Sequence, residues 1–287
     1  MASGAAVPRR GSAPRSARTG RLLTHGLLLV IGGVIAFPFL WMLLTALKTE
    51  REATAFPPTL LPMQPQWHNF VAAWRTEPLF PRYFLNTGLV AGCVTLSVMA
   101  TALLAGYAFG RLEFRGKRPL FVLYLATMMI PFEVVMIPNF ITVAKLGWYD
   151  RYAALMAPWM ANVFSIFLLT QFFRTLPGDF YEAAQLDGCS HWQFLWRIGR
   201  PLATPALATV GLFAFLASWN SLLWPLLVTQ SREMRTIEFG LAVFLQEEGT
   251  EPHLLMAASA IAMLPVLVLF LIAQRTFVEG VAAGIKG

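Results

Sequence analysis

The sequence contains little charge and little cysteine. Only 13% of its 287 residues are Asp, Glu, Lys or Arg, whereas 57% are hydrophobic. A soluble domain has about a quarter charged and about half apolar residues, so this composition excludes an ordinary soluble domain and indicates an integral membrane protein. The two cysteines, Cys93 and Cys189, cannot form a disulfide framework, and redox chemistry is not expected.

Motifs of nucleotide, metal and enzyme sites are also missing. The nearest approach to a phosphate-binding loop runs from Gly110 to Arg118. Five residues separate its glycines, one more than the G-x-x-x-x-G-K-[ST] pattern allows, and Arg118 replaces the hydroxyl that would bind Mg²⁺. The sequence contains no H-E-x-x-H, no G-x-S-x-G and no His or Cys cluster at metal-ligand spacing. It therefore predicts a chain that is not an enzyme, with no catalytic residue, metal or cofactor of its own.

What the sequence does contain is six long apolar runs. A helix needs about 20 residues to cross the hydrocarbon core of a membrane, and each run approaches or exceeds that length. The first run is longer than the apolar part of a secretory signal peptide, so we interpret it as a retained span. The sequence thus predicts an all-α membrane protein with six transmembrane helices. They are expected approximately at 22–44, 84–108, 120–143, 152–173, 202–227 and 254–273.

Lysine and arginine are distributed unevenly around these spans. If the N-terminus is cytoplasmic, 14 of the 22 lie on the cytoplasmic side and 8 on the other side. This bias favours a multi-pass protein of the cell (inner) membrane with both termini in the cytoplasm. Nucleic-acid binding is not expected, because the sequence has no soluble basic stripe with interleaved aromatic residues. The predicted regions are a disordered basic tail (1–21), a six-span domain (22–277) and a cytoplasmic tail (278–287).

The second span contains two G-x-x-x-G pairs. Gly88 and Gly92 form the first pair, and Gly106 and Gly110 form the second. Glycines at this spacing let another helix approach closely, which matters in lipid because no hydrophobic drive brings helices together there. Packing within the bundle and contact with another subunit are both compatible with the two pairs.

A polar segment separates the fourth and fifth spans. It reads YEAAQLDGCSHWQFLWRIGRPLATP over 181–205. Pro177 cannot continue the fourth span, and Asp179 can cap a new helix, which is expected over 180–186. Gly188 can adopt the positive φ of a sharp reversal. The first half of the segment is therefore predicted as a short helix that ends in a tight turn.

The second half of the segment predicts another short helix. Ser190 to Gln193 has the S-x-x-Q form of a capping box, and the helix is expected to continue to about Ile198. Pro201 then fits the first turn of the fifth span. The whole segment is predicted to lie outside the bilayer as a capped, rigid helix–turn–helix that a partner protein could bind.

The run EAAQLDG (182–188), followed by Ile198 and Pro201, resembles the EAA loop in the permease subunits of ABC importers. Its place between the fourth and fifth of six spans resembles the maltose-type carbohydrate uptake family, the binding-protein-dependent transport inner membrane components. The pair Trp219-Asn220 and the C-terminal FVEGVAAGIKG are also similar to that family.

The resemblance implies a permease subunit for a sugar or oligosaccharide, driven by ATP hydrolysed elsewhere. The loop would fit a cleft on a separate ATPase dimer, which binds ATP and Mg²⁺, and a second permease would complete the translocation path. An extracytoplasmic solute-binding protein and membrane lipid are the other expected partners. The glycine-rich tail would enter a gap between ATPase subunits as an extended strand. The implied residues are Glu182, Ala183, Ala184, Asp187 and Gly188 for coupling, and Gly284, Lys286 and Gly287 for the tail contact.

Polar residues inside spans are candidates for the substrate path, because placing them in lipid is costly. Glu133 is the only carboxylate deep in a predicted span, and Pro131 and Pro138 should break the helix around it. An ion pair or hydrogen bond with a neighbouring helix is the alternative role of Glu133.

Asn220 is the second candidate for the substrate path. It is expected in the middle of the fifth span, where Trp219 and Trp224 could stack on a sugar ring. A hydrogen bond across a helix interface is the alternative role of Asn220. The outer loops at 56–74 and 231–252 are too short for a binding domain and could dock the solute-binding protein.

Two other functions compete with that of a sugar permease subunit. An ion-coupled secondary transporter would bury several ionisable groups and repeat its spans internally, and the sequence shows neither feature. Within the importer class, the alternative substrate is glycerol phosphate or another polyol. The spans contain no arginine pair to hold a phosphate, which favours a neutral sugar.

Overall fold

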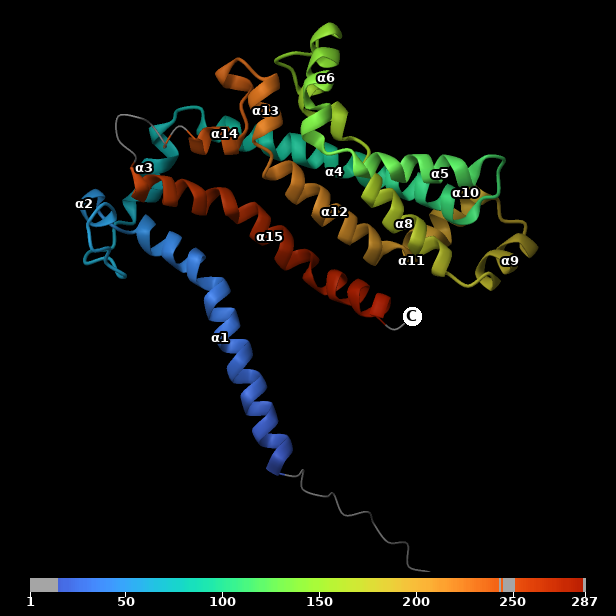
Figure 1. The fold of residues 1–287 in the computed structure, drawn as a ribbon, viewed down its shortest axis with the longest axis horizontal. Helices are drawn as coiled ribbons and strands as arrows, with labels where there is room; N and C mark the ends of the chain where they lie inside the picture. Colours follow the sequence, from blue (N-terminus) through green and yellow to red (C-terminus); the bar gives the residue numbers. More distant parts are fainter. Residues whose placement is uncertain (1–14, 243, 245–250, 286–287) are drawn as a thin grey trace, which may run out of the picture.

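The computed structural model describes residues 15–242, 244 and 251–285. Over these ranges the regular secondary structure is entirely helical (Figure 1), which confirms the predicted all-α class. Four stretches are long and apolar enough to cross a membrane without a sharp bend, and they match the predicted spans one, two, four and six. They belong to α1 (Arg15–Ala46), α4 (Phe80–Arg111), the series α7 (Tyr152–Met156), η2 (Ala157–Trp159) and α8 (Val163–Thr175), and α15 (Pro252–Ile285).

The third predicted span is broken in its middle. The helices before and after the break meet at 100°. The break falls at Pro131, which has extended backbone before α6 and no N–H to donate to the preceding turn. Pro138, by contrast, lies inside α6 without ending it, so only one of the two predicted breaks occurs. The elements are α5 (Lys117–Ala126), η1 (Thr127–Met129) and α6 (Phe132–Lys145).

The fifth predicted span is also not one helix. Its main helix ends at Trp219, and residues 220–222 separate it from the next short helix, so the expected single helix over 202–227 is wrong. A stretch of short helices precedes it and meets it at 76°. Counting each bent pair as one span gives six spans among the described residues. The elements are α10 (His191–Phe194), the π-helical η3 (Leu195–Gly199), α11 (Arg200–Leu202), α12 (Thr204–Trp219) and α13 (Leu223–Val228).

Helix α4 is the centre of the bundle and packs against α8 and α12 (Figure 1). A Cβ added to Gly106 would lie 2.5 Å from the Cβ of Leu169, and Gly110 approaches the same helix as closely. This glycine pair therefore lets α4 and α8 touch within the bundle. The other pair, Gly88 and Gly92, faces open space, because no heavy atom lies within 4 Å of a Cβ built on either residue.

Polar contacts between helices and the connections beside them hold together the end of the bundle that carries α3 and α14. Arg232 donates to both carboxylate oxygens of Glu77, at 2.9 and 2.7 Å, and Glu77 is only 3% exposed. The Asn86 amide donates to the backbone oxygen of Glu233 and accepts a hydrogen bond of 2.6 Å from the Tyr152 hydroxyl. The short elements here are α2 (Glu50–Ala53), α3 (His68–Thr76), η4 (Arg232–Met234) and α14 (Ile237–Ala242).

Asp150 ties the connection after α6 to the connection after α13. Its carboxylate accepts hydrogen bonds from the backbone N–H groups of Gln230 and Ser231, at 2.9 and 3.1 Å. Burial acts to raise the pKa of Asp150, but these hydrogen bonds outweigh it, so the pKa of this carboxyl lies below its ordinary value. The two loops are thus joined through the carboxylate of Asp150.

The two ends of the chain differ from the expected tails. Helix α1 begins at Arg15, inside the segment predicted as disordered, and it reaches the bundle only at its C-terminal end, beside α15 (Figure 1). Helix α15 continues to Ile285, so Gly284 is helical and the predicted tail is not extended over residues 278–285. Lys286 and Gly287, like residues 1–14, lie outside the described residues.

Candidate functional site

The polar segment after α8 folds as two short helices joined by a turn, as predicted. Its first helix is α9 (Asp179–Leu186), and Gly178 occupies the N-cap position, so the expectation that Asp179 caps this helix is wrong. Asp179 and Glu182 instead lie in the first turn, where negative charge favours the positive end of the helix dipole. We call residues 175–200 the coupling segment.

The turn after α9 is a Schellman motif. Gly188 has φ of 71°, and its N–H donates to the oxygen of Gln185, while the N–H of Cys189 donates to the oxygen of Ala184. The predicted positive φ of Gly188 is confirmed. These bonds satisfy the free carbonyl groups at the end of α9 and fix the direction in which the chain leaves it.

The second helix begins with the predicted capping box. Gln193 N donates to Ser190 Oγ at 3.3 Å, and Ser190 N donates to Gln193 Oε1 at 2.9 Å. The helical path continues beyond Ile198 through η3 and α11. Pro201 lies in α11 and Pro205 occupies the first turn of α12, so the assignment of Pro201 to that turn is wrong.

Aromatic side chains attach the coupling segment to α4 and α8. The hydroxyls of Tyr107 and Tyr181 lie 3.1 and 2.8 Å from Nδ1 of His191. The rings of Tyr107 and Tyr181 both pack against Phe194, which is almost completely buried, and Tyr107 also packs against Phe173 of α8. The Tyr–His–Tyr cluster thus joins both halves of the segment to the second span.

Arg111 makes a further attachment at the end of α4. Its guanidinium donates to the backbone oxygen of Leu176, where the chain leaves α8, and more weakly to that of Pro177, at 3.4 Å. The start of the coupling segment is therefore bound to the end of α4, in addition to the aromatic contacts.

The expected coupling residues divide into exposed and buried positions. Glu182, Ala183, Asp187 and Gly188 are exposed, whereas Ala184 is 6% exposed and faces the core. Sequence reasoning missed the exposed apolar side chains, of which Leu186 is 90% exposed. Large apolar residues in an otherwise polar segment were the signal that could have found them. They are Phe180, Leu186, Trp192 and Trp196.

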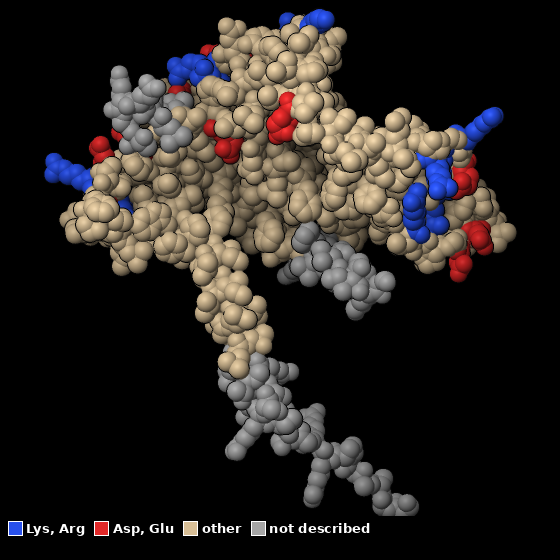
Figure 2. Space-filling view, viewed as in Figure 1, with Lys and Arg blue, Asp and Glu red and all other residues tan. Residues whose placement is uncertain are grey.

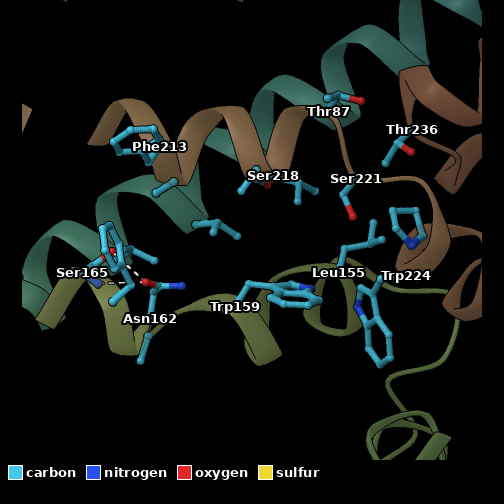
Figure 3. A pocket seen from close by; sticks show the side chains of 18 residues that line it. Thr87, Leu155, Trp159, Asn162, Ser165, Phe213, Ser218, Ser221, Trp224 and Thr236 are labelled. Atoms are coloured by element: carbon cyan, nitrogen blue, oxygen red, sulfur yellow. Dashed lines mark hydrogen bonds between the residues drawn. The ribbon is translucent and has the colours of Figure 1, made fainter. Parts of the chain in front are cut away.

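A cavity of about 360 Å³ lies between α4, η2, α8, α12 and α13 (Figure 3). Trp159 and Trp224 form one wall, with ring centroids 6.3 Å apart and nearly perpendicular planes. Ser218, near the end of α12, and Ser221, in the connection that follows, line the opposite wall (Figure 3). None of the side chains that line this cavity carries a charge.

The polar groups of the cavity are only partly bonded to the protein. Asn162 Oδ1 accepts hydrogen bonds from the backbone N–H and the hydroxyl of Ser165, both at 2.9 Å. The hydroxyl of Thr236 is buried and has no hydrogen-bond partner within the described part of the chain. A buried hydroxyl without a partner is costly, so a ligand that bonds to it would gain free energy.

The three residues predicted for the substrate path lie outside the lining of this cavity. Glu133 is exposed in the first turn of α6, just after the break at Pro131. Trp219 is 3% exposed, and its Nε1 donates to the oxygen of Ala262 at 3.2 Å. Asn220 is exposed at the end of α12 and so does not lie in the middle of a helix as expected, but its neighbour Ser221 lines the cavity. The structure does not bring the three together.

No group of three His, Cys, Asp or Glu side chains in the described ranges is arranged to hold a metal ion. What the structure presents is a helical membrane protein with bent spans, an uncharged cavity and a capped helix–turn–helix at one end. These features describe a polytopic membrane protein with a partly exposed, capped helix–turn–helix at one end. A family model for the binding-protein-dependent transport system inner membrane component matches residues 102–282, and the chain belongs to that family.

Similar curated proteins cover most of the chain. The arabinooligosaccharides transport system permease protein AraQ of Halalkalibacterium halodurans is 31% identical over 93% of this chain and 96% of its own length. The trehalose/maltose transport system permease protein MalG of Thermococcus litoralis is 34% identical, with 91% and 97% covered. The sn-glycerol-3-phosphate transport system permease protein UgpE of Yersinia pestis is 32% identical, with 88% and 93% covered.

A solved structure has the same fold. It is a bacterial ABC transporter involved in the import of the acidic polysaccharide alginate, and the similarity has a TM-score of 0.80 at 22% identity. The match covers 93% of this chain and 99% of the other. At this identity the likeness supports the arrangement of helices and no particular substrate.

Proposed function

We propose that this chain is the permease subunit of an ATP-driven importer of a sugar or oligosaccharide, and that it hydrolyses no ATP itself. The observation that carries the proposal is the coupling segment. Its helices are capped, its turn is fixed by a Schellman motif, and the Tyr107, Tyr181 and His191 cluster attaches it to α4. A segment built in this way transmits a displacement instead of absorbing it.

The path from the coupling segment to the cavity is short in sequence, and it bends once, by 76°, at Ala203 between α11 and α12. The segment runs through η3 and α11 into α12, whose far end supplies Ser218 to the cavity wall, and Ser221 follows in the connection to α13. A partner that moves α9 would therefore move one wall of the cavity relative to Trp159 and Trp224. Such motion of packed helices is a usual way to open and close a binding site.

The proposed partners follow from the exposed surfaces. An ATPase dimer holding ATP and Mg²⁺ would contact the exposed residues of the coupling segment, namely Glu182, Ala183, Leu186, Asp187 and Gly188. Ala184 is buried and would support this contact by packing α9 against the core of the chain. A second permease would complete the path, and the exposed apolar side chains of α1 fit such a partner or lipid. The loops at the α3 and α14 end would receive the solute-binding protein. In this arrangement both termini lie in the cytoplasm, and Gly284, Lys286 and Gly287 would face the ATPase.

A neutral carbohydrate is the proposed substrate. Trp159 and Trp224 offer aromatic surface, and Ser218, Ser221 and Thr236 offer hydroxyls, which together match the apolar faces and hydroxyl groups of a sugar. Glycerol phosphate stays a second candidate, because the relative UgpE is named for it. It is disfavoured by the cavity, where no cationic side chain is available to a phosphate.

Two of the predicted path residues keep a proposed role at the edges of the path. Asn220 is exposed beside Ser221, so its amide would meet substrate as it enters or leaves the cavity. Glu133 is exposed after the Pro131 break and would face the partner permease. Trp219, which is buried and bonded to Ala262, would support the end of α12 and would not stack on a sugar.

The proposal is tested by reversing one charge on the coupling segment. Glu182→Lys should leave membrane insertion unchanged, because Glu182 is exposed and lies outside the spans, and should reduce ATPase co-purification and ATP-driven uptake. Loss of a charge-assisted hydrogen bond typically costs about 1.5–3 kcal/mol, or roughly ten- to a hundredfold in affinity. Glu50→Lys, a charge reversal at an exposed position of α2 at the other end of the molecule (Figure 1), is the control. Normal uptake by Glu182→Lys would contradict a coupling role.

A further inference from the structure

A second cavity, of about 670 Å³, lies where the chain passes from α4 into α5. It is at the same end of the molecule as the coupling segment, and Figure 2 shows Lys and Arg side chains gathered at that end. The cavity is lined by Phe114, Phe121 and the first turn of α5, with Arg174 from the last turn of α8. It is separate from the uncharged cavity described above and shares no residue with it.

The charges around this cavity favour an anion. Three cationic side chains line it, namely Lys117, Arg118 and Arg174. Glu113 is the one carboxylate in the lining, and it lies 2.9 Å from Nζ of Lys117. That pair is neutral overall, so the two arginines leave an excess of positive charge facing the cavity.

The two arginines have different surroundings. The guanidinium of Arg174 lies over the ring of Phe121, 5.0 Å from its centroid, which restricts the guanidinium to this wall. Arg118 belongs to the first turn of α5, at the helix end where the partial charge of the backbone is positive. Arginine presents a planar set of donors that fits the oxygens of a phosphate group.

The surface next to the cavity is apolar and lies on a span. Leu120, Val122 and Leu123 follow immediately on α5 and are all exposed, and this helix is half of the bent third span. A ligand that fills the cavity with an anionic group can therefore lay hydrocarbon along α5. A free phosphate would use only the first of these two surfaces.

From the cavity, its charges and the adjoining apolar face, we propose that this site binds the anionic headgroup of a membrane phospholipid. The phosphate would lie between Arg118 and Arg174, and the acyl chains would lie against Leu120 and Leu123. Basic pockets at the ends of spans are a known way to hold acidic lipids. The site does not depend on the identity of the transported substrate.

The experiment uses the purified transporter that contains this chain, placed in nanodiscs of phosphatidylcholine mixed with phosphatidylglycerol. After detergent extraction, native mass spectrometry measures how much of each lipid stays bound. We expect preferential retention of phosphatidylglycerol by the wild type, and about a fivefold loss in Arg118→Gln and in Arg174→Gln, the effect of about one basic residue near an anionic surface. Inorganic phosphate in the extraction buffer should not displace the lipid.

Two matched variants make the result specific. Arg115→Gln removes an exposed charge of the same loop that does not line the cavity, and it should retain lipid like the wild type. Glu113→Gln removes the opposing carboxylate from an exposed position and should increase phosphatidylglycerol retention, so a gain is predicted even if the arginine variants fold poorly. Equal retention of both lipids by the wild type, or no gain in Glu113→Gln, would overturn the proposal. Displacement by inorganic phosphate would assign the site to soluble phosphate instead.

Discussion

In the coupling segment the hydroxyls of Tyr107 and Tyr181 both bond to His191, whereas at the uncharged cavity the buried hydroxyl of Thr236 has no partner in the described chain. The coupling segment satisfies its polar groups internally and exposes apolar side chains such as Leu186. The cavity differs, because one polar group in its lining, the hydroxyl of Thr236, is buried without a bond to the described chain. Hydrogen bonds within the protein make a region stiff. A polar group without such a bond stays available to a ligand.

Helix α4 belongs to both regions. Near its start it supplies Thr87 to the cavity, and near its end it supplies Tyr107 and Arg111 to the coupling segment. The two regions therefore share one helix and do not form separate domains. Variants along α4 and at its two ends test how far the regions act together.

The largest effect is expected where α4 touches α8. Gly106→Ala places a Cβ 2.5 Å from that of Leu169 and close to the α8 backbone, so the helices must move apart. Overpacking of this kind typically costs about 1–3 kcal/mol. The yield of folded protein and its melting temperature should both fall. Gly92→Ala is the matched control, since its Cβ meets nothing within 4 Å and alanine favours a helix. Equal behaviour of the two variants would show that α4 and α8 do not pack in this way.

A smaller effect, confined to coupling, is expected at the turn after α9. Gly188→Val forces a β-branched residue to a φ of 71°, which costs about 1–2 kcal/mol or more and distorts the Schellman turn. Membrane level should stay normal while ATP-driven uptake falls, because the turn lies outside the spans. Gly188→Asn is the control, since asparagine tolerates this conformation. If both variants took up substrate like the wild type, the shape of the turn would not matter for coupling.

A still smaller effect is expected from removing one hydroxyl of the Tyr–His–Tyr cluster. Tyr181→Phe keeps the ring packed on Phe194 but removes the hydrogen bonds to His191 and from Gln185. One such bond contributes about 0.5–1.5 kcal/mol. The ratio of substrate imported to ATP hydrolysed should fall, with little change in melting temperature. Tyr149→Phe, at an exposed tyrosine outside the segment, should leave that ratio unchanged. A Tyr181→Phe protein with a normal ratio would mean that the aromatic packing alone is stiff enough.

The sequence predicted the coupling segment better than the cavity, and the reason is physical. Caps and turns depend on residues close in the chain, so Ser190 with Gln193 and the positive φ of Gly188 could be read locally. The cavity collects side chains from distant helices, as in the pair Trp159 and Trp224. Apolar composition marks a span but does not say where a helix ends, which is why Asn220 was expected in the middle of one.

The smallest effect, and the one that separates binding from stability, is expected at Thr236. Thr236→Val replaces a buried hydroxyl that has no partner with a methyl group, so the melting temperature should stay the same or rise slightly. If substrate bonds to this hydroxyl, the same change should raise the substrate concentration needed for half-maximal uptake about fivefold, from about 1 kcal/mol of lost binding. Thr229→Val is the matched control, because its buried hydroxyl donates to Pro225 at 2.7 Å and does not line the cavity. That control should lose stability and keep its apparent affinity. A weaker apparent affinity without loss of stability in Thr236→Val, together with loss of stability alone in Thr229→Val, would indicate that substrate supplies the hydrogen bond that Thr236 lacks in the protein. Unchanged uptake by Thr236→Val would show that this hydroxyl does not contact the substrate.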